Sequence, residues 1–213
     1  MTELRITEIF YSLQGEAISS GYPTVFIRLT GCPLRCVYCD TEYAFQGGEL
    51  CSLADILGKV DQYNTDYVCV TGGEPLAQKE CLPLLEQLCD AGKYVSLETS
   101  GALDISQVDP RVSIVMDLKT PGSNEEGKNR LDNLESLKPS DQIKFVLRDI
   151  ADYDWAKNMI KEHQLNDRFE VLMSPVWENL SPTVLAEQIL KDQLNIRMQV
   201  QLHKILWNDE PGK

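Results

Sequence analysis

The sequence lacks any apolar run that approaches the roughly 20 residues needed for a membrane-spanning helix. Its polar first residues, MTELRITE, also lack the pattern of a signal peptide. Basic residues are few, with 20 Lys and Arg against 33 Asp and Glu, and no basic run offsets a net charge of −13 that would repel a phosphate backbone. We therefore expect a cytoplasmic protein that binds neither membranes nor nucleic acid and acts on a small molecule. Such acidity also serves solubility by itself.

The sequence has little histidine and no fourth ligand beside its cysteine cluster. Three cysteines fall within the stretch TGCPLRCVYCD at residues 30–40: Cys32, Cys36 and Cys39. A structural zinc site normally closes its shell with four Cys or His ligands. The two histidines, His163 and His203, lie far downstream, and the other four cysteines form no second C-x-x-C pair. The loop thus predicts a metal centre with one position left open.

Seven cysteines are an odd number, which in a cytosolic chain favours reduced thiols plus a metal site over a disulfide framework. The length of 213 residues, with 43% hydrophobic content, suffices for one well-buried core. We see no internal repeat, low-complexity tract or interdomain linker. The sequence therefore predicts a single domain over residues 1–213.

Short β-branched runs alternate with amphipathic segments along the chain. The runs predict strands at 24–30, 67–71, 94–98, 113–118, 142–147, 169–174 and 197–202. Helices are predicted at 52–63, starting from an N-cap at Ser52, at 79–93, ending at Gly92, and at 151–164 and 182–193. This alternation implies parallel strands and an α/β sheet, curved or closed. The polar segment 119–141 is too long for an ordinary connection and is expected to be functional or mobile.

The cysteine loop follows the first of these strands, at the edge where active sites of parallel α/β folds gather. The spacing Cys32-x3-Cys36-x2-Cys39 suits three thiolates around one 4Fe-4S cluster, with the fourth iron free. This loop resembles that of the radical S-adenosylmethionine (SAM) superfamily, in which the free iron binds the amino and carboxylate groups of SAM. The segment TGGEP at 71–75, which alone could be a simple turn, resembles the superfamily's glycine-rich SAM contact.

Further motifs narrow the resemblance. FYSLQGEA, VFIRLTGCPLRCVYCDT, SLETSG and LHKILW together are similar to the 7-carboxy-7-deazaguanine synthase family, across nearly the whole chain. The resemblance implies a partial, trimmed TIM-type barrel with a mostly parallel curved sheet, and a homodimer. It also implies a carbon-nitrogen lyase that converts 6-carboxy-5,6,7,8-tetrahydropterin to 7-carboxy-7-deazaguanine, with loss of ammonia, in queuosine and 7-deazapurine biosynthesis.

The resemblance implies three cofactors: a 4Fe-4S cluster, SAM and Mg²⁺. A reductant protein such as a flavodoxin or ferredoxin would supply the electron that cleaves SAM, and the resulting 5′-deoxyadenosyl radical would abstract hydrogen from C6 of the pterin; SAM is then regenerated. Two alternatives remain. Another radical SAM enzyme, such as a glycyl-radical activase, would lack SLQGE and the Thr after the cysteine-aspartate pair. A non-catalytic iron-sulfur or zinc protein would not bind SAM.

Site residues also follow from the resemblance. It makes Cys32, Cys36 and Cys39 the cluster ligands and Thr41 the Mg²⁺ ligand. It assigns to the substrate Leu13, Gln14, Gly15, Glu16, Arg28, Thr99 and His203. It assigns to SAM Tyr38, Cys39, Asp40, Gly72, Gly73, Glu74, Gly101, Gln142, Ile143 and Lys144.

Several of these residues have structural alternatives. Gln14 could form a hairpin turn with Gly15, Arg28 could pair with an internal Glu, Thr41 could cap the next turn, and the Thr-Ser-Gly after the strand could be a turn. His203 could be structural. The family's familiar Asn is here Ser100. We assign no role to Lys119 and no substrate contact to Pro211.

Overall fold

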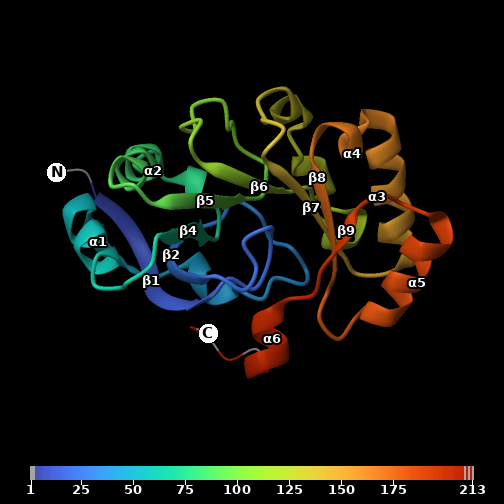
Figure 1. Ribbon diagram of the computed structural model, residues 1–213, viewed down its shortest axis with the longest axis horizontal. Helices are drawn as coiled ribbons and strands as arrows, with labels where there is room; N and C mark the ends of the chain where they lie inside the picture. Colours follow the sequence, from blue (N-terminus) through green and yellow to red (C-terminus); the bar gives the residue numbers. More distant parts are fainter. Residues whose placement is uncertain (1–2, 209, 211, 213) are drawn as a thin grey trace.

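The computed structural model describes residues 3–208, 210 and 212, so Pro211 lies outside the described residues. In this part of the chain, one curved sheet contains nine strands in the order β3-β1-β2-β4-β5-β6-β7-β8-β9 (Figure 1). The strands are β1 Glu3–Leu13, β2 Pro23–Leu29, β3 Glu49–Ser52, β4 Tyr67–Gly72, β5 Tyr94–Thr99, β6 Ser113–Asp117, β7 Gln142–Leu147, β8 Glu170–Pro175 and β9 Arg197–Met198. The helices are α1 Leu53–Val60, α2 Cys81–Asp90, α3 Ile150–His163, α4 Leu165–Arg168, α5 Pro182–Asp192 and α6 Leu202–Trp207.

From β2 through β4 to β9 every neighbouring pair is parallel, while β1 and β3 add an antiparallel edge. The sheet is curved but open, so the prediction of an α/β fold with a partial TIM-type barrel is confirmed. Parallel strands place all their C-terminal ends at one edge, which is where the cysteine loop emerges from β2. No helix in the described residues is long and apolar enough to cross a bilayer.

The two faces of the sheet differ in polarity. Alternate side chains such as Val25, Ile27 and Leu29 of β2 are buried in the main hydrophobic core, which they share with residues of α1 to α5. Figure 1 shows these helices around the outside of the sheet, whereas α6 lies apart from them. The intervening residues of the strands face inward and are often polar, as with Arg28 and Lys144. A polar concave face enclosed by an apolar shell is the arrangement expected for a barrel that binds its ligand inside.

The connection between β1 and β2 fills part of the concave face. Ala17 packs in a small buried cluster with Val115 of β6 and Leu172 of β8. Ile18 N donates to Gln142 Oε1 over 2.8 Å, at the first residue of β7. The connection therefore closes the N-terminal end of the barrel and leaves the C-terminal end, with the cysteine loop, for chemistry.

Most predicted elements are confirmed within one or two residues. Six predicted strands correspond to β2 and β4 to β8, and the four predicted helices correspond to α1, α2, α3 and α5. Ser52 caps α1 as predicted, since its side chain accepts from Asp55 N over 3.1 Å. Gly92 follows α2 with a φ of +79°, a conformation that glycine adopts without strain.

The prediction of a strand at 197–202 is wrong beyond Met198. There the chain leaves the sheet because its next residues bind the connection after β1: Gln199 Oε1 accepts from Ala17 N over 2.9 Å, and Leu202 N donates to Gly15 O over 3.1 Å. Residue 202 instead begins α6. The antiparallel strands β1 and β3 were not predicted.

Candidate active site

The cysteine loop is fixed at both of its flanks. Gly31 N donates to Ala44 O over 2.8 Å, and Gly31 O accepts from Glu74 N, also over 2.8 Å. Farther along, Arg35 N donates to Glu125 Oε1 over 2.6 Å. The loop is therefore held by the end of β4 and by the long segment after β6, which gives that segment a supporting role beside the cysteines.

The three thiols are free and half-buried. Burial raises the pKa of Cys36 to about 11, and the neighbouring Cys39 and Cys32 add to the rise while Lys119 opposes it. The three thiols are thus close enough to influence one another and stay protonated at neutral pH until a cation stabilises the thiolates. Lys119 itself pairs with Asp117, Nζ to Oδ2, over 2.8 Å.

Gly72 is the last residue of β4, and Gly73 follows it against the cysteine loop. A Cβ on Gly73 would lie 2.2 Å from Gly31 O and 2.8 Å from the Cβ of Cys32. On Gly72, which has a φ of +154°, it would lie 2.4 Å from Leu29 O. Gly73 therefore permits close contact with the cysteine loop and Gly72 permits close contact with the end of β2, and SAM contact from either glycine stays a prediction.

Gly73→Ala is expected to displace the cysteine loop, because backbone atoms on the opposing side cannot move aside independently. The variant should incorporate much less iron and sulfide on anaerobic reconstitution than the wild type. Gly58→Ala is the matched control, since a Cβ there meets no atom within 4 Å and the site lies inside α1. Equal iron content in Gly73→Ala and Gly58→Ala would show that the contact does not constrain the loop.

Glu74 is fully buried and its carboxylate is satisfied within the protein. It accepts from Ser100 N over 2.7 Å, from Ser100 Oγ over 2.5 Å, and from Thr99 Oγ1 over 2.9 and 3.0 Å. These bonds lock the end of β5 to the glycine-rich turn after β4. The Glu74 carboxylate and the Thr99 hydroxyl proton already take part in these internal hydrogen bonds. Contacts from Glu74 to SAM and from Thr99 to substrate stay predictions.

Arg28 has the internal partner that was the alternative to a substrate anion. Its Nε donates to Glu8 Oε1 over 2.7 Å, and Tyr43 OH donates to the same oxygen over 2.8 Å. The guanidinium carbon also lies over the Phe10 ring, 5.8 Å from its centroid. Arg28 is therefore preorganised on the concave face; its contact with the substrate stays a prediction.

The residues after β1 gather with the start of α6. Glu16 forms a buried ion pair with Lys144 and accepts from Gln201 Nε2 over 2.8 Å. A Cβ on Gly15 would lie 2.3 Å from His203 Nδ1, so the glycine admits the imidazole. Gln14 is buried, and its Nε2 has no partner among the described residues. These residues, Gln14 to Glu16 with the start of α6, form the floor of the site. The Gln14 amide is a buried donor there that a ligand would satisfy.

The hairpin turn at Gln14 and Gly15, the structural alternative to a substrate contact, does not form. Gln14 N instead donates to Tyr22 O over 2.9 Å, and Gly21 N donates to Gln14 O over 2.8 Å, so the connection is a longer loop. Leu13, the last residue of β1, immediately precedes this loop, and its contact with the substrate stays a prediction.

The end of the cysteine loop carries Tyr38, Asp40 and Thr41. Tyr38 OH donates to Val146 O over 3.2 Å, near the C-terminal end of β7. Thr41 occupies the N-cap of a short 3₁₀ helix, Glu42–Phe45, but its side chain makes no capping bond. Its hydroxyl donates to Asp40 Oδ1 over 2.8 Å. The turn-cap alternative therefore does not account for the Thr41 side chain.

The predicted SAM contacts on β7 are dispersed. Gln142 lies at the start of the strand, away from the cysteine loop, and its side chain binds Ile18 N. Ile143 is buried in the main core, so any contact with SAM would come from its backbone. Lys144 faces inward to Glu16. Gly101 lies two residues after Thr99, the last residue of β5. It has a φ of +69°, and a Cβ there would lie 2.8 Å from Cγ of Met116. These SAM assignments stay predictions.

Comparison with known proteins identifies the family of this chain. The Radical SAM superfamily profile matches residues 26–119. The chain is 42% identical over 210 residues to 7-carboxy-7-deazaguanine synthase of Chlorobaculum tepidum, covering 97% of this chain and 96% of that protein. It is 40% identical to that of Koribacter versatilis, covering 97% and 98%. The chain belongs to the 7-carboxy-7-deazaguanine synthase family.

Solved structures share the fold of this chain. QueE from Escherichia coli superposes with a TM-score of 0.79 over 95% of this chain and 96% of that one, at 24% identity. SuiB from Streptococcus suis gives 0.58 over 80% of this chain and 46% of that one, at 14% identity. As a member of a radical SAM synthase family, the protein is an enzyme whose family uses a 4Fe-4S cluster and SAM.

The residues of this 7-carboxy-7-deazaguanine synthase family member fit such a cluster. Cys32, Cys36 and Cys39 are three free thiols on one anchored loop, none of them fully buried. No three His, Cys, Asp or Glu side chains in the described ranges converge on a position for a single ion. A cluster does not require that convergence, because each thiolate binds a different iron.

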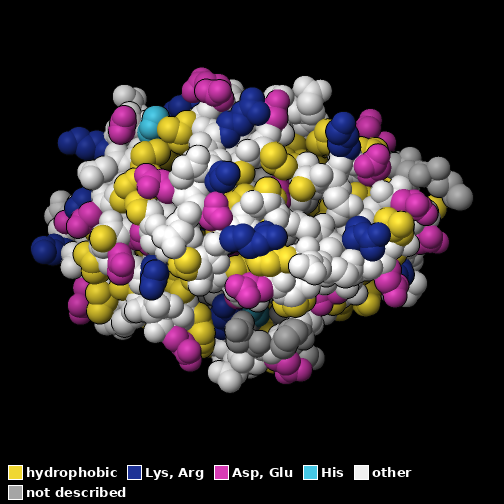
Figure 2. Space-filling view, turned by 180° about the vertical axis from the view of Figure 1, so that it is seen from behind, with side chains coloured by type: hydrophobic (Ala, Val, Ile, Leu, Met, Phe, Trp, Pro, Cys, Tyr) yellow, Lys and Arg dark blue, Asp and Glu magenta, His cyan; other side chains and the backbone are white. Residues whose placement is uncertain are grey.

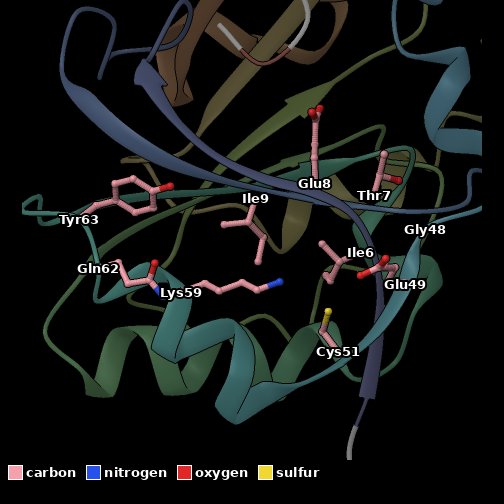
Figure 3. Close-up of a pocket in the computed structure, with 10 residues that line it drawn as sticks. All are labelled: Ile6, Thr7, Glu8, Ile9, Gly48, Glu49, Cys51, Lys59, Gln62 and Tyr63. Atoms are coloured by element: carbon pink, nitrogen blue, oxygen red, sulfur yellow. The ribbon is translucent and has the colours of Figure 1, made fainter.

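A cavity of about 670 Å³ lies elsewhere, between β1, β3 and α1. Its lining contains none of the predicted site residues. Figure 3 shows the Glu8 side chain on the opposite side of β1 from Lys59 and Cys51, so the partner of Arg28 points away from this cavity. Figure 2 shows acidic and basic side chains interspersed over the rear face of the molecule.

Sequence reasoning missed several polar residues of the site. They are Glu8, Tyr43, Glu98, Gln201 and Lys204. Glu98 lies on β5 and accepts from Thr71 Oγ1 over 3.0 Å. The motif LHKILW held a signal for Lys204, since this charged residue sits next to His203 in an otherwise apolar run.

Proposed function

We propose that this enzyme converts 6-carboxy-5,6,7,8-tetrahydropterin to 7-carboxy-7-deazaguanine with loss of ammonia, in queuosine or other 7-deazapurine biosynthesis. The observation that carries the proposal is identity of about two residues in five to proteins named for this synthase, over nearly the whole length of both chains. The polar concave face supports it, because the cysteine loop, Arg28 and the floor residue Gln14 all border that face.

Cys32, Cys36 and Cys39 would hold the 4Fe-4S cluster, and SAM would bind at the remaining iron, beside Gly72 and Gly73. Together these groups supply radical chemistry when bound. The protein itself binds and orients the pterin and SAM, and it excludes water from them. Gln14 and Glu16 suit the 2-amino-4-oxo edge of a pterin because an amide and a carboxylate match its donors and acceptors.

Arg28 suits the pterin carboxylate because a guanidinium binds a carboxylate through two parallel hydrogen bonds, and Glu8 binds its Nε. Arg28→Lys is expected to weaken binding of 6-carboxytetrahydropterin by about 2 kcal/mol, since a lysine loses the planar fork. Equilibrium titration of the reconstituted protein measures this, with iron content unchanged.

The matched control ligand is tetrahydropterin without the carboxylate. Wild type and Arg28→Lys should bind that ligand alike. Equal affinity of both proteins for the carboxylated pterin would show instead that Arg28 pairs only with Glu8 and does not bind the substrate.

Mg²⁺ would bind at Thr41 together with oxygens of the substrate. A neutral hydroxyl is a weak ligand and Mg²⁺ gives up water reluctantly, so the site should assemble when the pterin arrives. We further propose a homodimer in the cytoplasm, reduced by a protein such as a flavodoxin or ferredoxin.

Incubation of the reconstituted protein with SAM, reductant, Mg²⁺ and 6-carboxytetrahydropterin, followed by mass analysis, tests the proposal. A product that has lost one ammonia supports it. SAM cleavage with unchanged pterin would favour a different radical SAM reaction, and the absence of SAM binding would favour a non-catalytic protein.

A further inference from the structure

The Thr41 hydroxyl is oriented by its neighbour. Its one proton is donated to Asp40 Oδ1 over 2.8 Å, which leaves both oxygen lone pairs free of that bond. A hydroxyl binds a cation through a lone pair, so this orientation is the one that a metal requires. Thr41 is therefore set for a cation before any ligand binds.

Asp40 is itself held by the C-terminal segment. Its other oxygen, Oδ2, accepts from Lys204 Nζ over 3.0 Å and from Gln201 Nε2 over 3.4 Å. The Lys204 side chain is 4% exposed and that of Asp40 is 43% exposed. Three donors from Thr41, Gln201 and Lys204 therefore hold the Asp40 carboxylate.

We propose that Asp40 and Lys204 are positioning residues for a Mg²⁺ site at Thr41. Asp40 Oδ1 accepts the hydrogen bond of the Thr41 hydroxyl, and Asp40 Oδ2 accepts one from Lys204 Nζ. The ion then binds Thr41 and substrate rather than Asp40. This inference rests on the Mg²⁺ site of the proposed function.

The contribution of Lys204 follows from ligand strength and charge. A carboxylate is a much better Mg²⁺ ligand than a hydroxyl, so a free Asp40 would capture the ion without substrate. The ammonium of Lys204, 3.0 Å from Oδ2, repels a dication at that oxygen. Metal binding therefore depends on bound substrate. By thermodynamic linkage, substrate must raise the affinity for Mg²⁺ by the same factor as Mg²⁺ raises the affinity for substrate.

The same contacts join the metal residue to the substrate floor. Gln201 donates to both Glu16 Oε1 and Asp40 Oδ2, at 2.8 and 3.4 Å. Leu202 N donates to Gly15 O over 3.1 Å. The start of α6 therefore bridges the connection after β1 and the end of the cysteine loop.

The test is Mn²⁺ binding to reconstituted, SAM-loaded protein, measured from the EPR signal of free Mn²⁺ with and without 6-carboxytetrahydropterin. Wild type should bind Mn²⁺ tightly only with the pterin. Lys204→Met should bind it on the order of tenfold more tightly without pterin, and the gain from pterin should shrink by the same factor. Adding Asp40→Ala to Lys204→Met should remove the pterin-independent binding.

Further variants keep the test decisive. Lys204→Arg should behave as wild type, and Lys191→Met, at an exposed lysine of α5, is the control for loss of a lysine. Thr41→Ala should lose pterin-dependent binding. Wild type that never binds Mn²⁺ with pterin would overturn the Mg²⁺ site and this inference with it. Pterin-dependent binding that is unchanged in Lys204→Met and in Asp40→Ala would overturn the inference alone; if Lys204→Met does not fold, Asp40→Ala decides.

Discussion

Replacing Cys32, Cys36 or Cys39 with Ala is expected to abolish the visible absorbance of the 4Fe-4S cluster and all cleavage of SAM. With three protein ligands and one open iron, the loop has no spare thiolate to compensate for a loss. The effect should be complete for each of the three variants rather than graded, because each thiolate holds a different iron. Absorbance, iron and sulfide after anaerobic reconstitution measure it.

The controls are Cys51→Ala, Cys81→Ala and Cys89→Ala, which should keep the cluster. Cys51 and Cys81 belong to the main core and Cys89 packs against it, on the helical side of the sheet. A Cys-to-Ala change there removes modest apolar contact and no ligand. Loss of cluster in any of these controls would mean that the ligand set is incomplete.

Glu16→Gln should lower the free energy of unfolding by about 3 kcal/mol, because it leaves the ammonium of Lys144 buried without its anion. Both side chains are 11% exposed, so solvent screens the pair weakly. For a chain of this size the loss corresponds to a fall in Tm of roughly 10 °C. Thermal and denaturant unfolding of the protein without cofactors measure it.

Two comparisons isolate the buried pair. Glu187→Gln, at an exposed position of α5, should change stability by less than about 0.5 kcal/mol. The double variant Glu16→Gln/Lys144→Met should recover part of the loss, since it removes the buried charge. A double variant as unstable as the sum of its singles would contradict coupling between Glu16 and Lys144.

The stability effect should also depend on pH. Burial raises the pKa of Glu16, but Lys144 and Gln201 outweigh it, so the folded pKa lies below the ordinary 4.5. A carboxyl with a lowered pKa contributes its full stability above the unfolded value and loses it as pH falls through the folded value. The gap between wild type and Glu16→Gln should therefore stay constant from pH 7 to about 5 and shrink below about 4.5.

Local patterns in the sequence sufficed to predict the cysteine loop and its strand. The loop depends on a short spacing, and β2 on a continuous apolar run, both visible without tertiary information. Strand β1 was missed because its register shifts between Ile6 and Glu8, which breaks the alternation that reveals a strand. The partner of Arg28 was missed with it, since Glu8 lies on that strand.

The C-terminal part of the site depended on distant contacts. The segment RMQVQL has the alternation of a strand, yet Gln199 and Leu202 bind the connection after β1 instead. The pairing of Lys204 with Asp40 joins residues 164 positions apart. No local pattern encodes such a pair, so proximity to His203 was the available signal.

The most direct test of the account is product formation under limiting SAM. Reconstituted protein, reductant, Mg²⁺ and excess 6-carboxytetrahydropterin are incubated anaerobically with less SAM than pterin, and 7-carboxy-7-deazaguanine is quantified by mass. The wild-type protein should form deazaguanine product in excess of the SAM supplied, and the Cys36→Ala protein should form none. Full cluster occupancy and bound SAM without any deazaguanine product would contradict it.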